Sequence, residues 1–171
     1  KKYFASSELI INEDGSVFHL HVKPEWLADK VILVGDPDGG TGASHFENKE
    51  CEVESREFKT ITGTYQGKRI TVVSTGIGCD NIDIVMNELD ALAHIGEEKP
   101  HLRSLELVRI GTCGGLQPYT PVGTFVCSEK SIGFDGRSTS MPDATPCATC
   151  PWSVPSSTIW DGPATCVPLP P

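Results

Sequence analysis

Apolar and polar positions follow two spacings along this chain, and together they predict an α/β fold. Residues 31–34 are a short apolar run typical of a buried parallel strand, and residues 105–110 predict a second apolar parallel strand. Residues 57–65 and 69–74 predict a hairpin around Gln66-Gly67-Lys68. A helix is predicted next, with Asp80 or Asn81 as its N-cap, because apolar residues recur there at helical spacing: Ile82, Val85, Met86, Leu89, Leu92 and Ala93. We therefore expect a mixed central sheet flanked by helices.

Two further runs are strand-like but weaker, at residues 17–22 and 123–128. The pattern changes at residue 137, because eight of the thirteen prolines lie in the last 35 residues or so. We expect a domain over residues 1–136 and an irregular tail without a fold of its own over 137–171. The tail contains one Cys-x-x-Cys, residues 147–150, without the second ligand pair that a zinc site needs, so no metal site is predicted.

Glycine-rich turns follow three of the predicted strands, at residues 35–37, 75–78 and 111–115. Glycine allows the backbone to approach a ligand closely and to direct N–H groups at it. Arg109 lies two residues before the third turn, near the end of the predicted strand, and adds a cationic fork suited to phosphate or carboxylate. Because open α/β sheets bind ligands at the carboxyl ends of their strands, these turns predict an anion site.

The formal net charge of −9 over 171 residues disfavours binding to nucleic acid or to an anionic membrane, which both need a basic face. A small anion needs only a few local arginines. No apolar run approaches the length of a membrane span, and the first residues lack a signal-peptide core. The scattered cysteines read as reduced thiols, and a cytoplasmic protein is the expectation.

Three motifs occur in a characteristic order: Val31-Ile32-Leu33-Val34-Gly35-Asp36-Pro37, Ser74-Thr75-Gly76-Ile77-Gly78 and Val108-Arg109-Ile110-Gly111-Thr112-Cys113-Gly114-Gly115-Leu116-Gln117-Pro118. With this order, residues 8–136 resemble the nucleoside phosphorylase family of the single α/β domain type, and within it the uridine phosphorylases. The segments Val17-Phe18-His19-Leu20 and Ser55-Arg56-Glu57-Phe58 are also similar to family motifs.

The resemblance implies a transferase of nucleotide salvage that carries out reversible phosphorolysis of uridine. Phosphate attacks the anomeric carbon, uracil leaves and ribose 1-phosphate forms, with oxocarbenium character developing at the sugar. Inorganic phosphate is then a co-substrate, and neither a catalytic metal nor an organic cofactor is required. A homodimer or larger homo-oligomer with shared sites is also implied.

The resemblance assigns roles to individual residues. Gly35 would donate a backbone N–H to phosphate, and Arg109 would be the main phosphate ligand. Thr112 would place its hydroxyl between phosphate and ribose. Arg56 would reach the phosphate in the neighbouring subunit's site, and His19 would cap that neighbour's ribose.

Further positions follow from the same resemblance. Cys113 and Gly114 would line the space near ribose and base. In some uridine phosphorylases a monovalent cation is held near the second glycine turn, and Glu57 and Ile77 match those places. Asn81 stands where a serine is expected, which weakens this candidate.

Two departures from the family pattern bear on activity. Gly39 stands where family members usually have an arginine that binds phosphate. Residues 137–171 also contain no match to the segments that read uracil and bind the ribose hydroxyls. These departures lead to the hypothesis that the chain is a truncated or out-of-frame version of a uridine phosphorylase, or its N-terminal part.

Other interpretations remain open. One is a nucleosidase that uses water in place of phosphate, and another is a non-catalytic remnant that binds nucleoside or phosphate. At single residues, Arg109 could pair with Glu106, and Arg56 could be a surface charge beside Glu54 and Glu57. His19 could be an ordinary packed or solvent-facing histidine.

Overall fold

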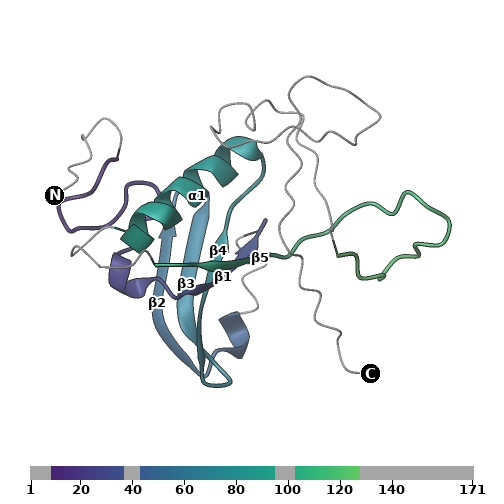
Figure 1. Ribbon diagram of the computed structural model, residues 1–171, viewed down its shortest axis with the longest axis horizontal. Coiled ribbons are helices and arrows are strands. Elements are labelled where there is room, and N and C mark those ends of the chain that lie inside the picture. Colours follow the sequence, from purple (N-terminus) through teal and green to yellow (C-terminus); the bar gives the residue numbers. More distant parts are fainter. Residues whose placement is uncertain (1–8, 37–42, 95–102, 128–171) are drawn as a thin grey trace. The chain divides into compact units, whose positions relative to one another are not determined.

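The computed structural model describes residues 9–36, 43–94 and 103–127 (Figure 1). Its ordered elements are a 3-10 helix, one α-helix and five strands: η1 (Pro24–Trp26), β1 (Lys30–Val34), β2 (Asn48–Ser55), β3 (Phe58–Tyr65), β4 (Lys68–Ser74), α1 (Cys79–His94) and β5 (Glu106–Arg109). The strands form one sheet in the order β2-β3-β4-β1-β5. The chain divides into two compact units, residues 1–112 and 113–171, and all of these elements belong to the first.

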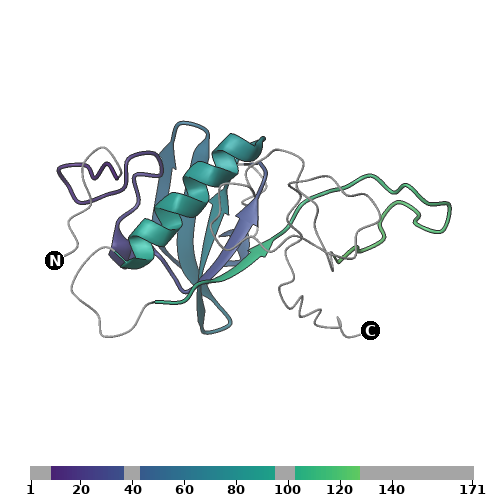
Figure 2. The ribbon, with the colours of Figure 1, turned by 45° about the horizontal axis from the view of Figure 1, so that its top comes forward.

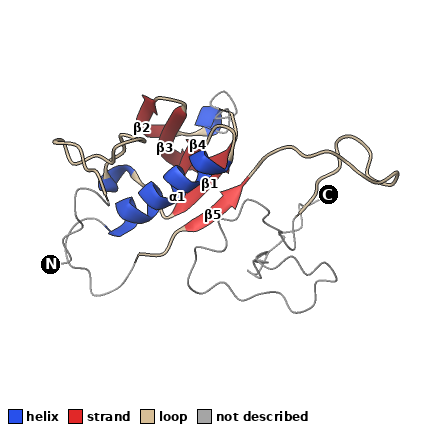
Figure 3. Cartoon of the chain, turned by 90° about the horizontal axis from the view of Figure 1, so that it is seen from above, coloured by secondary structure: helices blue, strands red, loops and turns tan. Residues whose placement is uncertain are grey.

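The sheet is mixed, as the sequence pattern predicts. Strand β1 pairs in parallel with both β4 and β5, whereas β2, β3 and β4 pair in antiparallel. Val34 is in register with Ser74, and Leu33 is in register with Arg109. The three parallel strands therefore end at the same edge of the sheet, which is also visible for β1 and β5 in Figure 3.

Helix α1 covers one face of this sheet (Figures 1 and 2). Most of its predicted apolar stripe is confirmed, because Val85, Leu89 and Leu92 are buried in a cluster with Val31, Leu33, Phe58 and Val73 from the strands. Met86, which the stripe also included, is exposed. The helix begins at Cys79, directly after Gly78 at a φ of 105°. Asp80 and Asn81 therefore lie inside the first turn, and the prediction that one of them is the N-cap is wrong.

The opposite face of the sheet carries an apolar hollow of about 350 Å³. It is lined mainly by side chains that alternate with those of the core along β1 and β4, as a strand period of two requires. The lining residues are Ile32, Val34, His45, Phe46, Tyr65, Ile70, Val72 and Ile110.

The hairpin between β3 and β4 is confirmed, and it turns through Gln66 and Gly67 at φ values of 48° and 71°. Positive φ at both central residues is the geometry of a type I′ turn, which suits the twist of the two strands. Strand β2, by contrast, is absent from the sequence prediction. Its alternation is masked because half of its residues are charged and it lies at one edge of the sheet with mostly exposed side chains.

Two weaker strand predictions are wrong within the described residues. Residues 17–22 form a tight turn, in which the N–H of Val17 donates to the carbonyl of Val22 at 3.0 Å and His21 has a φ of 53°. Residues 123–127 contain no strand. The predicted domain boundary at residue 136 and the tail lie outside the described residues.

Candidate active site

The first two glycine turns, and the start of the third, follow the ends of β1, β4 and β5 at one edge of the sheet. After β4, both the N–H and the hydroxyl of Thr75 donate to the carbonyl of Val34, at 2.8 and 3.1 Å. After β5, the N–H of Ile110 donates to the carbonyl of Leu33 at 2.9 Å. These bonds continue the parallel ladder past the last strand residues, so the sheet itself sets where the turns begin.

The first two turns lie against one another. A Cβ atom at Gly35 would be 4.0 Å from the carbonyl oxygen of Gly76, so two glycine backbones meet without side chains between them. Gly76 has a φ of 64°, and a Cβ atom there would be 2.8 Å from Nδ2 of Asn81 and 3.6 Å from Cγ of Glu57. The turn between β2 and β3, which contains Glu57, therefore also reaches this edge.

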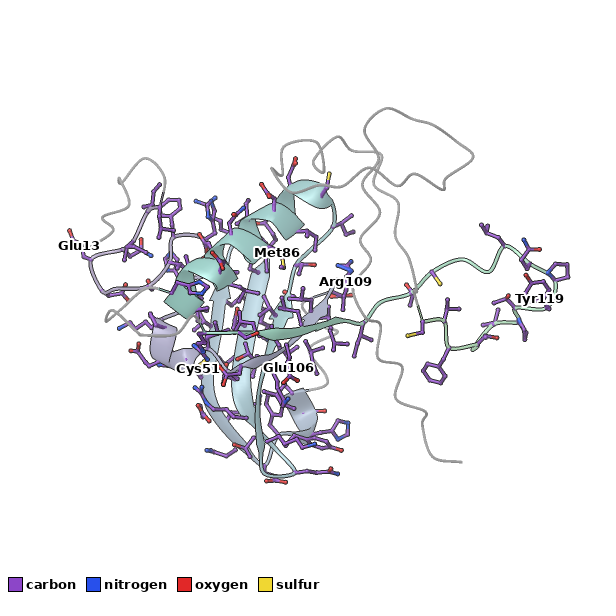
Figure 4. All side chains as sticks on the ribbon, viewed as in Figure 1. Glu13, Cys51, Met86, Glu106, Arg109 and Tyr119 are labelled. Carbon is purple, nitrogen blue, oxygen red and sulfur yellow. The ribbon has the colours of Figure 1, made fainter. Side chains whose placement is uncertain are left out.

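Arg109 is the last residue of β5 and its side chain is exposed (Figure 4). Among the residues that the structure describes, its guanidinium has no ion pair. Glu106, the partner that the sequence left open, binds the ammonium of Lys30 at 2.5 Å instead. The reason is geometric, because residues three apart in a strand point to opposite faces of the sheet. Arg109 shares the α1 face with its register partner Leu33.

The other two strand-associated arginines differ from Arg109 in this respect. Arg69 binds Glu50 at 2.7 Å and donates to the carbonyls of Leu27 and Glu25. Arg103 binds Asp29 at 2.6 Å and donates to the same Leu27 carbonyl. Both guanidinium groups thus help to hold the segment around Leu27.

Arg56 lies in the turn between β2 and β3, at a φ of 57°. Its guanidinium stands 5.2 Å from the ring centre of Phe18, within the range of a cation–π contact. In the described part of the chain it has no ion pair with Glu54 or Glu57, the neighbours that the surface-charge interpretation considered. A positive φ in a non-glycine residue is strained, and Arg56 keeps this conformation in the turn where its guanidinium contacts Phe18.

Phe18 connects Arg56 to His19. The rings of Phe18 and His19 meet edge to face, with their centres 5.0 Å apart. The turn at residues 17–22 therefore brings His19 and Arg56 together. The resemblance assigns both residues to the completion of a neighbouring subunit's site.

His19 in turn contacts Glu88, a residue that sequence reasoning missed. Nδ1 of His19 lies 2.7 Å from Oε1 of Glu88, and the backbone N–H groups of His19 and Leu20 also donate to this carboxylate. Glu88 is buried on the apolar face of α1. Its signal in the sequence is a charged residue on the stripe of Val85 and Leu92.

The remaining predicted residues are placed less closely. Thr112 is exposed and is the last residue of the first compact unit. Cys113 and Gly114 are exposed and begin the second unit. Gly39 lies outside the described residues. The roles assigned to Thr112, Cys113 and Gly114 stay predictions.

The candidate cation position is partly used by the protein itself. Nδ2 of Asn81 donates to the carbonyl of Ile77 at 3.3 Å, which occupies one of the oxygens that a cation would need. Over residues 9–36, 43–94 and 103–127, no group of three or more His, Cys, Asp or Glu side chains is arranged to hold a metal ion. The four cysteines in these ranges, Cys51, Cys79, Cys113 and Cys127, are free thiols.

No helix in the described ranges is both long and apolar enough to span a membrane. The edge where β1, β4 and β5 end carries the glycines Gly35 and Gly76 and the guanidinium of Arg109, which has no ion pair with any residue that the structure describes. This combination suits a small oxyanion.

Comparison with known proteins identifies the family of the chain. The family model of the phosphorylase superfamily matches residues 29–157, and the chain belongs to this family. A uridine phosphorylase of Thermococcus kodakarensis is 32% identical over 136 residues, which are 79% of this chain and 46% of that protein. A DeoD-type purine nucleoside phosphorylase of Roseobacter denitrificans is 32% identical over 125 residues, which are 72% of this chain and 50% of that protein.

Solved structures show the same fold. A Trypanosoma brucei nucleoside phosphorylase, described as showing uridine phosphorylase activity, superposes with a TM-score of 0.65 at 33% identity, over 77% of this chain and 46% of that one. The chain thus has the fold of the nucleoside phosphorylases, as the motifs predict. It spans about half the length of the curated relatives it matches.

Proposed function

We propose that this chain binds inorganic phosphate at the carboxyl edge of its sheet and serves the reversible phosphorolysis of uridine to uracil and ribose 1-phosphate. The observation that carries the proposal is the state of the arginines. Arg69 and Arg103 are held by carboxylates and carbonyls, whereas Arg109 is exposed at the ligand edge without an ion pair to any described residue. An arginine left uncommitted beside glycine N–H groups is suited to bind phosphate.

The proposed chemistry follows from this placement. Phosphate held by Arg109 and the N–H of Gly35 would be positioned to attack the anomeric carbon, and Thr112 would bridge phosphate and ribose. Fixing the nucleophile replaces a bimolecular encounter by an oriented one, and the guanidinium stabilises the negative charge that shifts during transfer. The choice of uridine rests on similarity to uridine phosphorylases, while the purine-specific relatives are about equally similar.

We infer further that the working protein is a homodimer or larger homo-oligomer. The packing of Arg56 on Phe18, and of Phe18 on His19, forms a unit that could complete a neighbour's site. The free thiols fit a reducing compartment, which supports a cytoplasmic enzyme of nucleotide salvage. Light scattering of the purified chain, and localisation of a tagged chain in cells, would test these two points.

The decisive assay uses uridine with and without phosphate and measures uracil together with ribose 1-phosphate. The proposal expects uracil to form only when phosphate is present, with one ribose 1-phosphate for each uracil. Uracil released at the same rate without phosphate would identify a nucleosidase. Bound phosphate without any turnover would identify a non-catalytic binding protein, and absence of both would contradict the proposal.

A further inference from the structure

Glu88 is a buried carboxylate whose place in the fold is unusual. It lies in the middle of α1 between Val85 and Leu92 on the face that packs against the sheet, and it is only 6% exposed. Burying a carboxylate is costly unless hydrogen bonds replace its water. Its partners therefore decide what this residue does.

Three N–H groups of one turn supply those hydrogen bonds. The backbone N–H of Leu20 donates to Oε2 at 2.8 Å, and the backbone N–H of His19 donates to Oε1 at 2.8 Å. The third contact joins Oε1 to Nδ1 of the His19 ring at 2.7 Å. The two backbone bonds would be enough to anchor the turn, so the third one fixes the ring in addition.

This third contact determines the chemistry of the imidazole. An ionised carboxylate only accepts hydrogen bonds, so Nδ1 must carry the hydrogen. In the neutral ring Nε2 is then a lone-pair acceptor. Phe18 packs edge to face against the ring, and the His19 side chain remains 28% exposed. The charged group that faces this side of the turn is Arg56, stacked on Phe18.

We propose that Glu88 is a positioning residue that holds His19 with Nε2 presented as a hydrogen-bond acceptor to a ribose hydroxyl of the nucleoside. This inference rests on the proposed function, in which His19 caps the ribose of a neighbouring site. It also predicts the substrate class: a nucleoside that donates a free hydroxyl to Nε2 is preferred over an analogue lacking that hydroxyl, because an acceptor that the bound nucleoside covers and leaves unpaired weakens binding.

The first test reads the ring directly and needs no activity. Long-range ¹H–¹⁵N spectra of the uniformly labelled chain distinguish protonated from unprotonated ring nitrogens, and His19→Gln assigns the signal. The neutral ring of His19 is expected to carry its hydrogen on Nδ1. A hydrogen on Nε2 in the unsubstituted chain would overturn the proposal, without recourse to any variant of Glu88.

The second test compares variants for their effect on nucleoside and phosphate separately. Glu88→Gln leaves one oxygen acceptor in place of two, so it should weaken the preference for the Nδ1-protonated form and raise KM for uridine roughly tenfold, the scale of one lost hydrogen bond. Phosphate affinity should stay unchanged, because Arg109 and Gly35 are untouched. Glu88→Asp keeps the carboxylate, so its preference for the Nδ1-protonated ring and its KM for uridine should lie between those of the unsubstituted chain and of Glu88→Gln.

A matched control is present on the same helix. Asp90 contacts Nδ1 of His94 at 3.1 Å in an exposed i,i+4 pair, so Asp90→Asn removes an equivalent charge without touching His19. It should change neither the His19 spectrum nor KM for uridine.

The substrate prediction is tested with the three monodeoxy uridines. One of the three analogues should bind the unsubstituted chain more weakly than uridine does. The same analogue and uridine should bind Glu88→Gln with about equal affinity. Equal losses in both proteins would overturn the role of Glu88. Failure of the proposed function is recognised separately, because uridine and phosphate would then give no turnover while the ring spectrum still reports the Glu88–His19 pair.

Discussion

Gly76 shows how one residue shapes the edge of the sheet where β1, β4 and β5 end. Its φ of 64° lies in the left-handed region, and its missing side chain leaves room for the amide of Asn81. A side chain at this position would be strained by the backbone and crowded by Asn81 at once. Two independent features of the turn, its left-handed backbone and the nearby amide of Asn81, therefore require a glycine here, quite apart from any ligand.

Gly76→Ala should lower the free energy of unfolding by about 1–2 kcal/mol, because the left-handed conformation disfavours a Cβ atom. Urea denaturation measures this loss. In an Asn81→Ala background the same substitution should cost less, since the atom 2.8 Å from the new methyl group is gone. An alanine at position 76 that leaves stability unchanged would show that the turn differs from the one described.

Glu88 illustrates what a sequence reveals about single residues. Its spacing from Val85 and Leu92 marks it as an acid on an apolar stripe, which is a visible signal. Its partner His19 is 69 positions away, and no periodicity links the two. Arg109, in contrast, was predicted as a ligand residue because its signal is local: an arginine at a strand end beside a glycine turn.

Among the elements, those with a clear period were predicted and those without one were not. Strands β1 and β4 are mainly apolar because their side chains pack in the core on one face of the sheet and line the apolar hollow on the other. Strand β2 is an edge strand in which charged residues pair with lysines, so it lacks an apolar period. The segment at residues 17–22 has strand-like composition, but the hydrogen bonds that Glu88 accepts hold it as a turn.

The β2–β3 pair should respond to acid in a defined direction. Hydrogen bonds from Lys59 and Lys49, at 3.1 and 3.2 Å, lower the pKa of Glu52 below its ordinary value of 4.5. Because the folded state favours the ionised form, this contribution to stability is complete above pH 4.5 and is lost as the pH falls through the lowered pKa.

Glu52→Gln removes this contribution. Its stability difference from the unsubstituted chain, measured by urea denaturation, should shrink as the pH falls below 4.5. High salt should reduce the difference at neutral pH, because the groups are exposed and screened. A stability difference that does not change with pH would show that the contacts of Glu52 with Lys49 and Lys59 are not its cause.

At the scale of the whole molecule, an acidic chain is proposed to bind an anion. The net charge of −9 opposes phosphate at long range, so affinity must come from the local site. The mixed sheet could be predicted from the pattern of strands and turns, and the family from the three motifs. The contact of Arg56 with Phe18 could not, since it depends on the strained turn and on the segment around His19.

The most direct measurement is a calorimetric titration of inorganic phosphate into three proteins: the unsubstituted chain, Arg109→Ala and Lys68→Ala. Lys68 is exposed at the start of β4, at the far end of the sheet, so both variants lose one positive charge. We predict that Arg109→Ala weakens phosphate binding by about 1.5–3 kcal/mol, whereas Lys68→Ala leaves it nearly unchanged. Equal affinities in all three proteins, or equal losses in both variants, would contradict a phosphate site at Arg109.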